Sequence, residues 1–476
     1  MSRQATGLSA ELPRKALHIG SGAFALVLRW IGPLEAALAA GVALLFNLLL
    51  LHRLSGHTLL RQHERSRGFS WGIALYPAVV LALVLVFSRR LELAAAVWGL
   101  LAIGDGMAAV VGLVAGGPRL PWNPTKRWLG LVAFTLWGTA ASAFLLRWTQ
   151  LGVLDGGGTG PSRIGASFLA TSSADAWLPD PAFLLLGCFV AALAAALAES
   201  IDAGVDDNVV VPVAGGIVLW LATSVEPGRL AAAAPAWSVA LVPALALNLA
   251  LAAAAYFART VSRSGAIVGL ALGTALYTTG GAAAFLQLFL FFVLGSAATR
   301  IGLARKRALG IEEERGGRRG AANALANTTT GVSCAFLAGT TGRPSLALAA
   351  LAGAFATAAF DTVSSEIGKV YGRRTVLVTS FRRVPPGTAG AVSLEGTLAG
   401  CAAAGLVAGV AWTTGQVPLV AAGLVVVAAF VGATVESYLG ALTASGRRFE
   451  NHLMNFVNTV VGAATAAALV AAVGLG

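Results

Sequence analysis

Residues 100–112 read LLAIGDGMAAVVG, and residues 120–130, which follow closely, read LPWNPTKRWLG. The first stretch is apolar enough to cross a bilayer except at Asp105, whose neighbouring glycines would let a ligand or another backbone approach closely. A carboxylate at membrane depth costs roughly 3 kcal/mol even on lenient insertion scales, so a compensating partner is expected. Lys126 and Arg127 supply cations within one loop. The stretch therefore predicts a membrane helix with a functional acid. The alternative is an ion pair between Asp105 and Lys126 that only locks two helices together.

The chain has the composition of a membrane protein. Of its 476 residues, 57% are hydrophobic and only 11% are charged, and the mean hydropathy is +0.79. Soluble domains carry about 25% charged residues. Apolar runs of roughly 17–25 residues, the length that crosses a bilayer, recur along the chain, and we count about fourteen to fifteen of them. We therefore expect an all-α polytopic integral membrane protein of two helical-bundle halves, in which abundant Ala and Gly allow close helix packing.

The net charge of +12 would suggest a nucleic-acid partner in a soluble protein, but membrane topology explains it better. When the predicted spans are numbered in order, most of the 33 Lys and Arg fall in the N-terminal arm and in the loops after even-numbered spans. By the positive-inside rule this side is cytoplasmic. We expect a multi-pass protein of the cell inner membrane, with active-site loops in the cytoplasm and no nucleic-acid partner. The three cysteines lie in apolar runs without metal or disulfide spacing.

Other polar residues of the first half fall on the same predicted side. His18 lies about one helical turn after Arg14 and Lys15 at the start of the first span. They suit anion binding, and interfacial snorkelling of the two cations is an equal alternative. Residues 198–208 read AESIDAGVDDN and hold four acids and one Asn without Lys or Arg. Oxygen ligands favour a hard ion such as Mg²⁺, which takes one or two carboxylates plus substrate phosphates. The alternative is a solvated hydrophilic loop.

Four motifs of the first half follow one another in residues 14–18, 104–106, 123–130 and 199–212. In this order they resemble the motifs of the dolichol kinase and phytol kinase family, which is related in turn to phosphatidate cytidylyltransferases. The resemblance covers about residues 10–225, and we assign residues 1–230 to this first domain. It implies phosphorylation of a long isoprenoid alcohol by a nucleoside triphosphate, usually CTP, with Mg²⁺ as cofactor.

The resemblance also implies roles for individual side chains. Catalysis would fall to Asp105, Lys126 and Glu199, with either Asp105 or Glu199 as the general base. The implied metal ligands are Asp105, Asp206 and Asp207. The implied nucleotide or phosphate ligands are Arg14, Lys15, His18, Asn123, Arg127 and Asn208. The sequence contains no GxxxxGK[ST] motif, so the mechanism of soluble P-loop kinases is not expected.

The second half carries its own acids, beginning in residues 360–368, which read FDTVSSEIG. Asp361 and Glu366 are five residues apart, about 140° around an ideal helix. They would share a ligand only if the helix breaks between them, and the alternative is a pair buried for helix packing. Residues 384–396, VPPGTAGAVSLEG, form a glycine-rich approach to a span, where backbone N–H groups suit phosphate. Further polar positions in the last two spans are Glu436, Asn451, Asn455 and Asn458.

Six motifs of the second half lie in residues 262–265, 295–302, 323–327, 361–368, 386–396 and 451–455. Together they resemble the family that contains plant phytyl-phosphate kinase, a group of membrane proteins long known only as a domain of unknown function. The resemblance covers about residues 235–476, and we assign residues 231–476 to this second domain. It implies the addition of another phosphate to a prenyl monophosphate.

This second resemblance implies Asp361 and Glu366 as catalytic residues and, together with Glu436, as metal ligands. Glu436 stands where the family pattern predicts Asp, and Arg300 stands where Lys is common. The implied nucleotide or phosphate ligands are Arg300, Asn323, Asn327, Lys369, Gly387, Thr388, Asn451 and Asn455.

The two resemblances meet in one reaction sequence. They predict a fused, bifunctional salvage kinase that converts an isoprenoid alcohol such as phytol or geranylgeraniol to its monophosphate and then to its diphosphate. The expected partners are the alcohol, its monophosphate, the bilayer, and CTP or a related nucleotide with Mg²⁺. A CDP-lipid synthase is the alternative enzyme, because of the cytidylyltransferase kinship. A secondary transporter with broken helices is a third hypothesis, although the acids cluster at one predicted membrane face rather than at the midplane.

Overall fold

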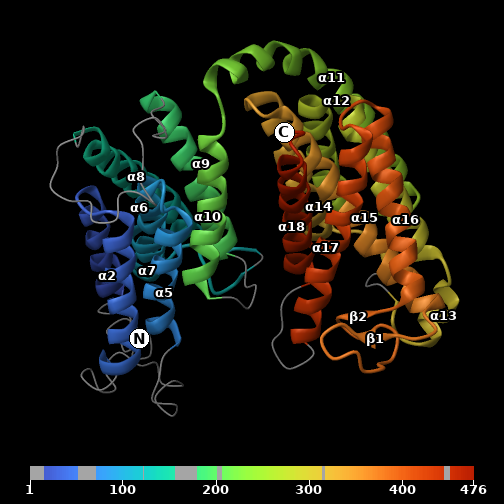
Figure 1. Ribbon diagram of the computed structural model, residues 1–476, viewed down its shortest axis with the longest axis horizontal. Coiled ribbons are helices and arrows are strands. Elements are labelled where there is room, and N and C mark those ends of the chain that lie inside the picture. The colour runs from blue at the N-terminus through green and yellow to red at the C-terminus, as the bar shows by residue number, and fades with distance from the viewer. Residues whose placement is uncertain are drawn as a thin grey trace. The chain divides into compact units, whose positions relative to one another are not determined.

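The computed structural model of this chain describes residues 15–51, 71–121, 123–155, 180–200, 206–312, 317–443 and 451–476. Within these ranges almost all regular structure is helical (Figure 1). The elements of the first part are η1 (Gly22–Arg29), α2 (Pro33–Phe46), η2 (Asn47–Leu51), α5 (Trp71–Val86), α6 (Leu91–Gly99), η3 (Leu100–Gly104), α7 (Asp105–Val114), α8 (Trp128–Asp155), α9 (Pro181–Ser200) and α10 (Asp207–Thr223). Those of the second part are α11 (Pro227–Phe257), α12 (Arg263–Arg300), α13 (Leu303–Ala308), α14 (Ala321–Thr340), α15 (Pro344–Tyr371), β1 (Val376–Leu377), β2 (Ala391–Val392), α16 (Leu394–Thr413), α17 (Leu419–Thr443) and α18 (Asn451–Ala472).

The expected all-α polytopic class is confirmed. In the described part of the chain, ten helices are long and apolar enough to cross a membrane, and two shorter apolar helices accompany them. A helix satisfies its own backbone hydrogen bonds, which is why lipid selects it. The ten are fewer than the fourteen to fifteen runs counted in the sequence. One reason is that α11 uses 31 residues for one span, and another is that α12, with 38 residues, is interrupted at the non-helical Gly281 and so joins two apolar runs in one element.

The chain divides into two compact units, Met1–Thr223 and Ser224–Gly476. In the first unit, α8 and α9 pack against α6, η3, α7 and α10. Its core combines large apolar side chains such as Leu100, Phe134 and Leu146 with alanines of α9, including Ala191 and Ala195. These small residues let the helices approach closely, as the high alanine content led us to expect.

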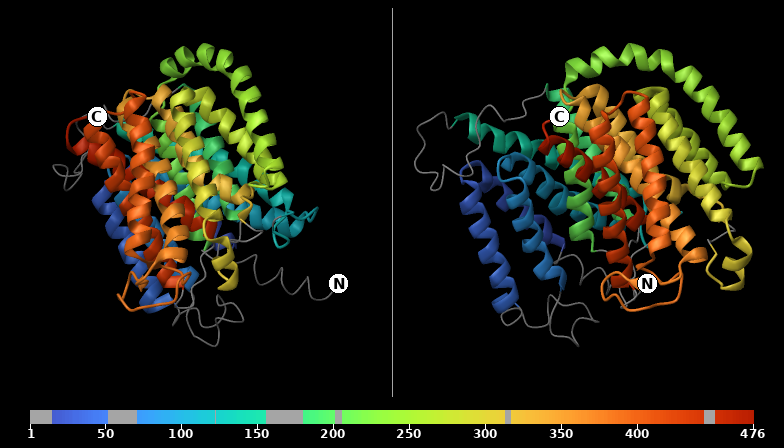
Figure 2. Two further views of the ribbon diagram at one scale, coloured as in Figure 1. Left: turned by 90° about the vertical axis from the view of Figure 1, so that its right-hand side faces the viewer. Right: turned by 45° about the vertical axis from the view of Figure 1, so that its right-hand side comes forward.

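The second unit is built around α15. This helix packs against α12, α14, α16, α17 and α18. In its most apolar 18-residue stretch 72% of the residues are buried, whereas in the corresponding stretch of α11 only 11% are. Residues 349–360 of α15 are all buried, and most of them are small. By contrast α11, which contains Pro235 and Pro243, arches along the outside of this unit beside α12 (Figure 2). Prolines inside a helix bend it.

Helix boundaries follow local sequence signals. Pro33, Pro181, Pro227 and Pro344 each occupy the first position of a helix, where the missing N–H costs nothing. Ser262 and Ser393 accept a hydrogen bond from the backbone N–H three residues later and so cap α12 and α16. The hairpin of β1 and β2, paired antiparallel with Val376 opposite Val392, connects the end of α15 to the start of α16. The polar residues predicted to form sites therefore lie mostly at helix ends.

Candidate functional site

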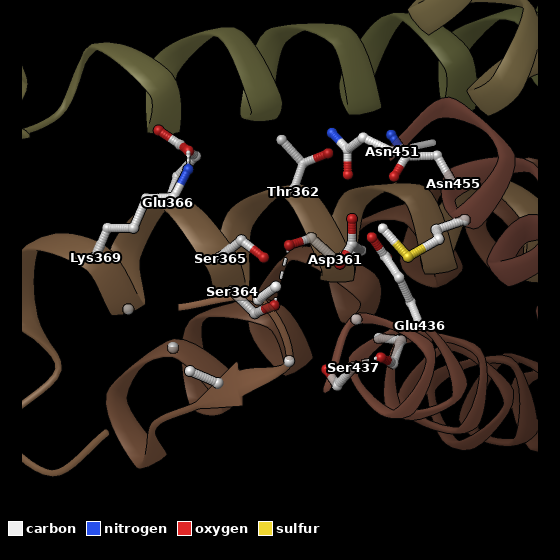
Figure 3. Close-up of a pocket in the computed structure, with 18 of the residues that line it drawn as sticks. Asp361, Thr362, Ser364, Ser365, Glu366, Lys369, Glu436, Ser437, Asn451 and Asn455 are labelled. Carbon is white, nitrogen blue, oxygen red and sulfur yellow. Dashed lines mark hydrogen bonds and ion pairs between the residues drawn. The ribbon is translucent and has the colours of Figure 1, made fainter. Parts of the chain in front are cut away.

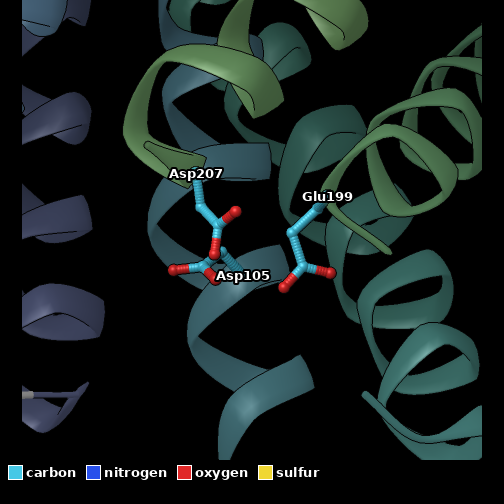
Figure 4. Close-up of side chains that lie close together, drawn as sticks. All are labelled: Asp105, Glu199 and Asp207. Carbon is cyan, nitrogen blue, oxygen red and sulfur yellow. The ribbon is translucent and has the colours of Figure 1, made fainter. Parts of the chain in front are cut away.

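Three acidic side chains of the first unit converge. Asp105 begins α7, Glu199 lies at the end of α9, and Asp207 begins α10 (Figure 4). One carboxylate oxygen from each lies within 4.8 Å of the other two. Asp105 and Glu199 are buried, with 3% and 7% of their surface exposed, whereas Asp207 is partly exposed. Asp105, Glu199 and Asp207 are called the acid triad below.

Cations surround the acid triad. Lys15 Nζ lies 2.8 Å from Asp105 Oδ2, and His18 Nε2 lies 3.3 Å from the same oxygen. Lys126 contacts Glu199 and lies 3.2 Å from Asp207 Oδ2. Asp105 thus pairs with Lys15 rather than with Lys126, the partner that sequence proximity suggested.

Lys126 lies in the loop before α8, outside the membrane-spanning segments. Burial by itself would lower the pKa of Lys126, but the carboxylates of Glu199 and Asp207 outweigh it, so the pKa lies above its ordinary value. The Lys126 ammonium is therefore charged throughout the physiological pH range, as a phosphate contact requires.

The backbone before Asp105 is distorted. Residues Leu100–Gly104 form a π-helical turn between α6 and α7, a feature often found at functional sites. The flanking glycines have a packing role that differs from the predicted approach of a ligand. A Cβ on Gly104 would lie 2.9 Å from Phe134, and a Cβ on Gly106 would lie 2.3 Å from Ile19. Both glycines therefore admit neighbouring side chains.

The other residues predicted for this site lie around the triad without joining it. Asn123 is buried; its Nδ2 donates to the carbonyl of Ser200 and its Oδ1 accepts from Thr125, so the amide braces the loop. Arg127 donates to the carbonyl of Gly117. Asp206 accepts from both the backbone and side-chain nitrogens of Asn208 at the start of α10. The hydrogen bond between Asp206 and Asn208 leaves Asp207 as the acid that reaches the cluster. Arg14 lies outside the described residues.

The second unit contains a large polar cavity of about 960 Å³. It lies at one end of the helical bundle, among the ends of α15 and α17, the starts of α14, α16 and α18, and the β1–β2 segment. Nine predicted site residues line it: Asn323, Asp361, Glu366, Lys369, Gly387, Thr388, Glu436, Asn451 and Asn455. Figure 3 shows Asp361 of α15 and Glu436 of α17 close together.

Asp361 and Glu436 form the acidic centre of this cavity. Their carboxyl groups lie near enough for the charge of Asp361 to act on Glu436. Two neighbouring carboxylates repel each other unless they share a proton or a cation. Asn458 Nδ2 donates to Glu436 Oε2 at 2.5 Å, and the Asn455 amide, in the orientation that satisfies its neighbours, donates to Glu436 Oε1 at 3.2 Å. These amides orient Glu436 toward Asp361.

Glu366 has a different environment. The helix does not break between Asp361 and Glu366, and Figure 3 shows Glu366 farther along α15, beside Lys369. Its carboxylate is buried and bonds Lys306 Nζ at 2.5 Å and Lys369 Nζ at 2.7 Å. Lys306 also donates to the carbonyls of Ala298 and Thr299 near the end of α12. The prediction that Asp361 and Glu366 form a pair is therefore wrong. In the structure Asp361 lies beside Glu436, and Glu366 pairs with lysines.

Positive charge and positive helix ends face the same cavity. Arg318, Arg319 and Lys369 line it. So do Ser264, Asn323, Ser393 and Asn451, from the N-terminal ends of α12, α14, α16 and α18. Helix N-termini present unsatisfied N–H groups and a partial positive charge, which suits phosphate. The cavity thus combines a carboxylate pair with several anion-binding groups.

Comparison with known proteins places the chain in a family. Residues 246–465 match the family described as integral membrane protein DUF92. The uncharacterized membrane protein sll0875 of Synechocystis is 39% identical over 199 residues, which are 41% of this chain and 77% of that protein. The chain belongs to the DUF92 family. This confirms the resemblance of the second half to a membrane family known as a domain of unknown function, and the match covers the polar cavity.

Two further relatives of this DUF92 protein are named as chloroplastic, and one of them is named a probable phytol kinase. Protein VTE6, chloroplastic, of Arabidopsis thaliana is 38% identical over 213 residues, 43% of this chain and 64% of the relative. The chain thus covers slightly less than two thirds of that protein. Probable phytol kinase 2, chloroplastic, of Oryza sativa is 28% identical over 221 residues, 44% of this chain and 65% of the relative. No solved structure matches the chain.

Two residues predicted for the DUF92 site lie outside its polar cavity. Arg300 is exposed and donates to the carbonyl of Ala258, and Asn327 is buried in the wall of a neighbouring apolar cavity. Sequence reasoning in turn missed Arg318 and Arg319, which we had counted only as part of a charged cytoplasmic loop. Their position directly before the helix start at Gly320 was the available signal, because a helix N-terminus next to cations is a typical anion site.

Proposed function

We propose that the DUF92 unit is a prenyl-phosphate kinase. The observation that carries this proposal is the combination, in one cavity, of the Asp361–Glu436 pair with Arg318, Arg319, Lys369 and four helix N-termini. Phosphoryl transfer depends mainly on positioning and on neutralising phosphate charge, and this cavity offers groups for both. A relative of the chain named probable phytol kinase supports a kinase that acts on prenyl substrates.

In the proposed reaction, a phosphate oxygen of the prenyl monophosphate attacks the γ-phosphorus of CTP or a related nucleotide. A new P–O bond forms, the bond to the β-phosphate oxygen breaks, and the nucleoside diphosphate leaves. Asp361 and Glu436, an all-oxygen donor pair, fit Mg²⁺ and would hold it. When bound, the ion neutralises charge on the transferring phosphoryl group. Arg319 and the helix N-termini would orient the phosphates.

For the first unit we propose the preceding step, phosphorylation of the alcohol itself. The acid triad also offers only oxygen donors, which fit a hard cation. Asp105 or Glu199 would take the proton of the alcohol, while Lys15 and Lys126, which now neutralise the triad, would contact the phosphates. Together the units would form a bifunctional isoprenoid-alcohol salvage kinase. The charge distribution in the sequence supports a cytoplasmic position for both sites in an inner membrane.

The test is a product analysis with the full chain in detergent, supplied with phytol or geranylgeraniol, CTP and Mg²⁺. We expect both the monophosphate and the diphosphate. Asp105→Asn should abolish monophosphate formation but still convert added monophosphate to diphosphate, whereas Asp361→Asn should let monophosphate accumulate. Glu226→Gln, which changes an exposed acid outside the acid triad and the polar cavity, is the control and should match the wild type.

Three outcomes would contradict the proposal. Absence of both products with each of the common nucleoside triphosphates would exclude a kinase. Release of pyrophosphate with transfer of CMP would identify a CDP-lipid synthase. Solute uptake that depends on an ion gradient, without phosphorylated product, would identify a transporter.

A further inference from the structure

A second cavity of the DUF92 unit is almost entirely apolar. It measures about 420 Å³, lies among α11, α12 and α14, and is walled by alanines together with large side chains. The large ones include Leu251, Leu272, Phe285, Phe289 and Phe292. Its volume falls within the roughly 300–1,000 Å³ typical of ligand pockets. Such a cavity suits a hydrocarbon chain.

The apolar cavity adjoins the polar cavity, because Arg319 and Asn323 line both. The backbone of Arg319 is fixed between the ends of two helices: its N–H donates to the carbonyl of Thr260, and its carbonyl accepts from Ser262, each at 3.0 Å. Its guanidinium carbon lies 5.0 Å from the ring centre of Phe291. The boundary between the two cavities therefore carries a cation that lies against an aromatic ring.

The length of the apolar cavity can be read from its helices. The cavity is lined by residues 265–272 in the first part of α12, by residues 285–293 in its second part, and by residues 248–258 of α11. At 1.5 Å per residue these stretches correspond to roughly 10, 12 and 15 Å. The end near Gly265 adjoins Arg319, since a Cβ on Gly265 would lie 2.2 Å from the Arg319 carbonyl oxygen. The cavity therefore leads away from the polar site into the bundle.

From this continuity we infer that the apolar cavity binds the isoprenoid chain of the substrate, with the chain's phosphate beside Arg319 and facing Asp361. The inference rests on the proposed kinase function and adds to it the position of the chain. A chain seated here would place its charged end at the junction of the two cavities. The part of the chain closest to the phosphate would lie along α12.

Gly269 offers a direct test. It lines the apolar cavity, and a Cβ there would meet nothing within 4 Å, so Gly269→Leu would fill the cavity. Gly405→Leu in α16 is the matched control, since Gly405 also has open space but is exposed and lines neither cavity. The probe is a photoreactive C20 prenyl monophosphate analogue bound to the full chain in detergent. We expect Gly269→Leu to weaken its binding at least tenfold while binding of a C5 prenyl phosphate changes less than twofold, and Gly405→Leu to change neither.

Gly295→Ala tests the phosphate end. A Cβ there would lie 2.0 Å from Arg319 Nη2, the far end of a flexible side chain, so the guanidinium would move without a backbone change. We expect weaker binding of both phosphates and unchanged cross-linking of a photoreactive prenyl alcohol. In the wild type, cross-links should map to α11 and α12.

The outcomes separate the two proposals. Cross-links to α11 and α12 without any phosphorylated product would retain the chain site and overturn the kinase. Product formation with cross-links elsewhere, with equal effects of Gly269→Leu and Gly405→Leu, or with displacement by phospholipid alone would overturn the chain site.

Discussion

The contacts of Lys306 lead to a sharp prediction about stability. Only 1% of the Lys306 side chain and 3% of the Glu366 side chain are exposed, and their charged atoms lie 2.5 Å apart. Lys306→Met would remove the ammonium while keeping most of the side-chain volume. It would leave the buried Glu366 carboxylate with Lys369 and would also remove the bonds to the carbonyls of Ala298 and Thr299.

The magnitude follows from burial. Removing one partner of a buried ion pair costs about 3–5 kcal/mol, because the other charge is left without full compensation. Since Lys369 still neutralises Glu366, we expect Lys306→Met to lower the free energy of unfolding by about 3 kcal/mol, the lower end of this range. The neighbouring Arg307 pairs with Glu312 at 2.9 Å, with 60% and 40% of the two side chains exposed. Breaking such a surface pair with Arg307→Met should cost about 1 kcal/mol or less.

The assay is denaturant-induced unfolding of the purified chain in mixed micelles, followed by maleimide reaction of Cys334, which is buried in α14. The double variant Lys306→Met with Glu366→Gln removes the buried charge as well. It should therefore be more stable than Lys306→Met alone, and a double-mutant cycle should report a coupling of about 1–3 kcal/mol. If Lys306→Met costs no more than Arg307→Met, the ion pair does not stabilise the bundle as argued.

Three further outcomes are expected. Gly462→Ala would place a Cβ 1.9 Å from Thr357 Oγ1 and should destabilise the chain by about 1–3 kcal/mol, whereas Gly409→Ala, with open space, should be neutral or slightly stabilising in thermal unfolding. Because the pKa of Lys126 is raised above its ordinary value of 10.5, the stability from its ion pairs is fully present below 10.5 and is lost as the pH rises from there through the raised pKa. Lys126→Met should thus lower stability by about 2 kcal/mol at pH 7, and the difference from wild type should shrink as the pH rises beyond 10.5; a difference independent of pH would contradict this. EDTA should abolish product formation by both units, and added Mg²⁺ should restore it.

Much of the architecture was predictable because lipid allows few solutions. A long apolar run in a membrane has to become a helix, so the class follows from composition alone. Many predicted site residues lie at helix ends, where the polar side chains of membrane helices concentrate. Asp361, Asn323 and Asn451 come from three different helices and still line one cavity.

The pairing of these residues was not predictable, because it depends on which helices become neighbours. Asp361 and Glu366 were predicted to act together, on the condition that the helix between them breaks, and the helix is continuous. No pattern within one helix could identify Glu436 as the neighbour of Asp361. The same limit applies to Asp105, whose partner Lys15 comes from the helical residues 15–21 directly before η1. Gly104 was ambiguous for another reason: a missing Cβ admits a ligand and a neighbouring side chain equally well, and the structure places Phe134 there.

The burial of α15 has a consequence for how substrate preference can change. Asp361 directly follows twelve consecutive buried residues, 349–360, so its backbone moves only if the whole core moves. Another part of the wall of the polar cavity comes from the segment between Thr375 and Val392, much of which is exposed. Asp361 therefore adjoins a fully buried stretch of this unit, whereas residues 375–392 lie largely at its surface. If the cavity binds a nucleotide as proposed, variation in residues 375–392 would alter which nucleotide fits without disturbing the position of the Asp361 carboxylate.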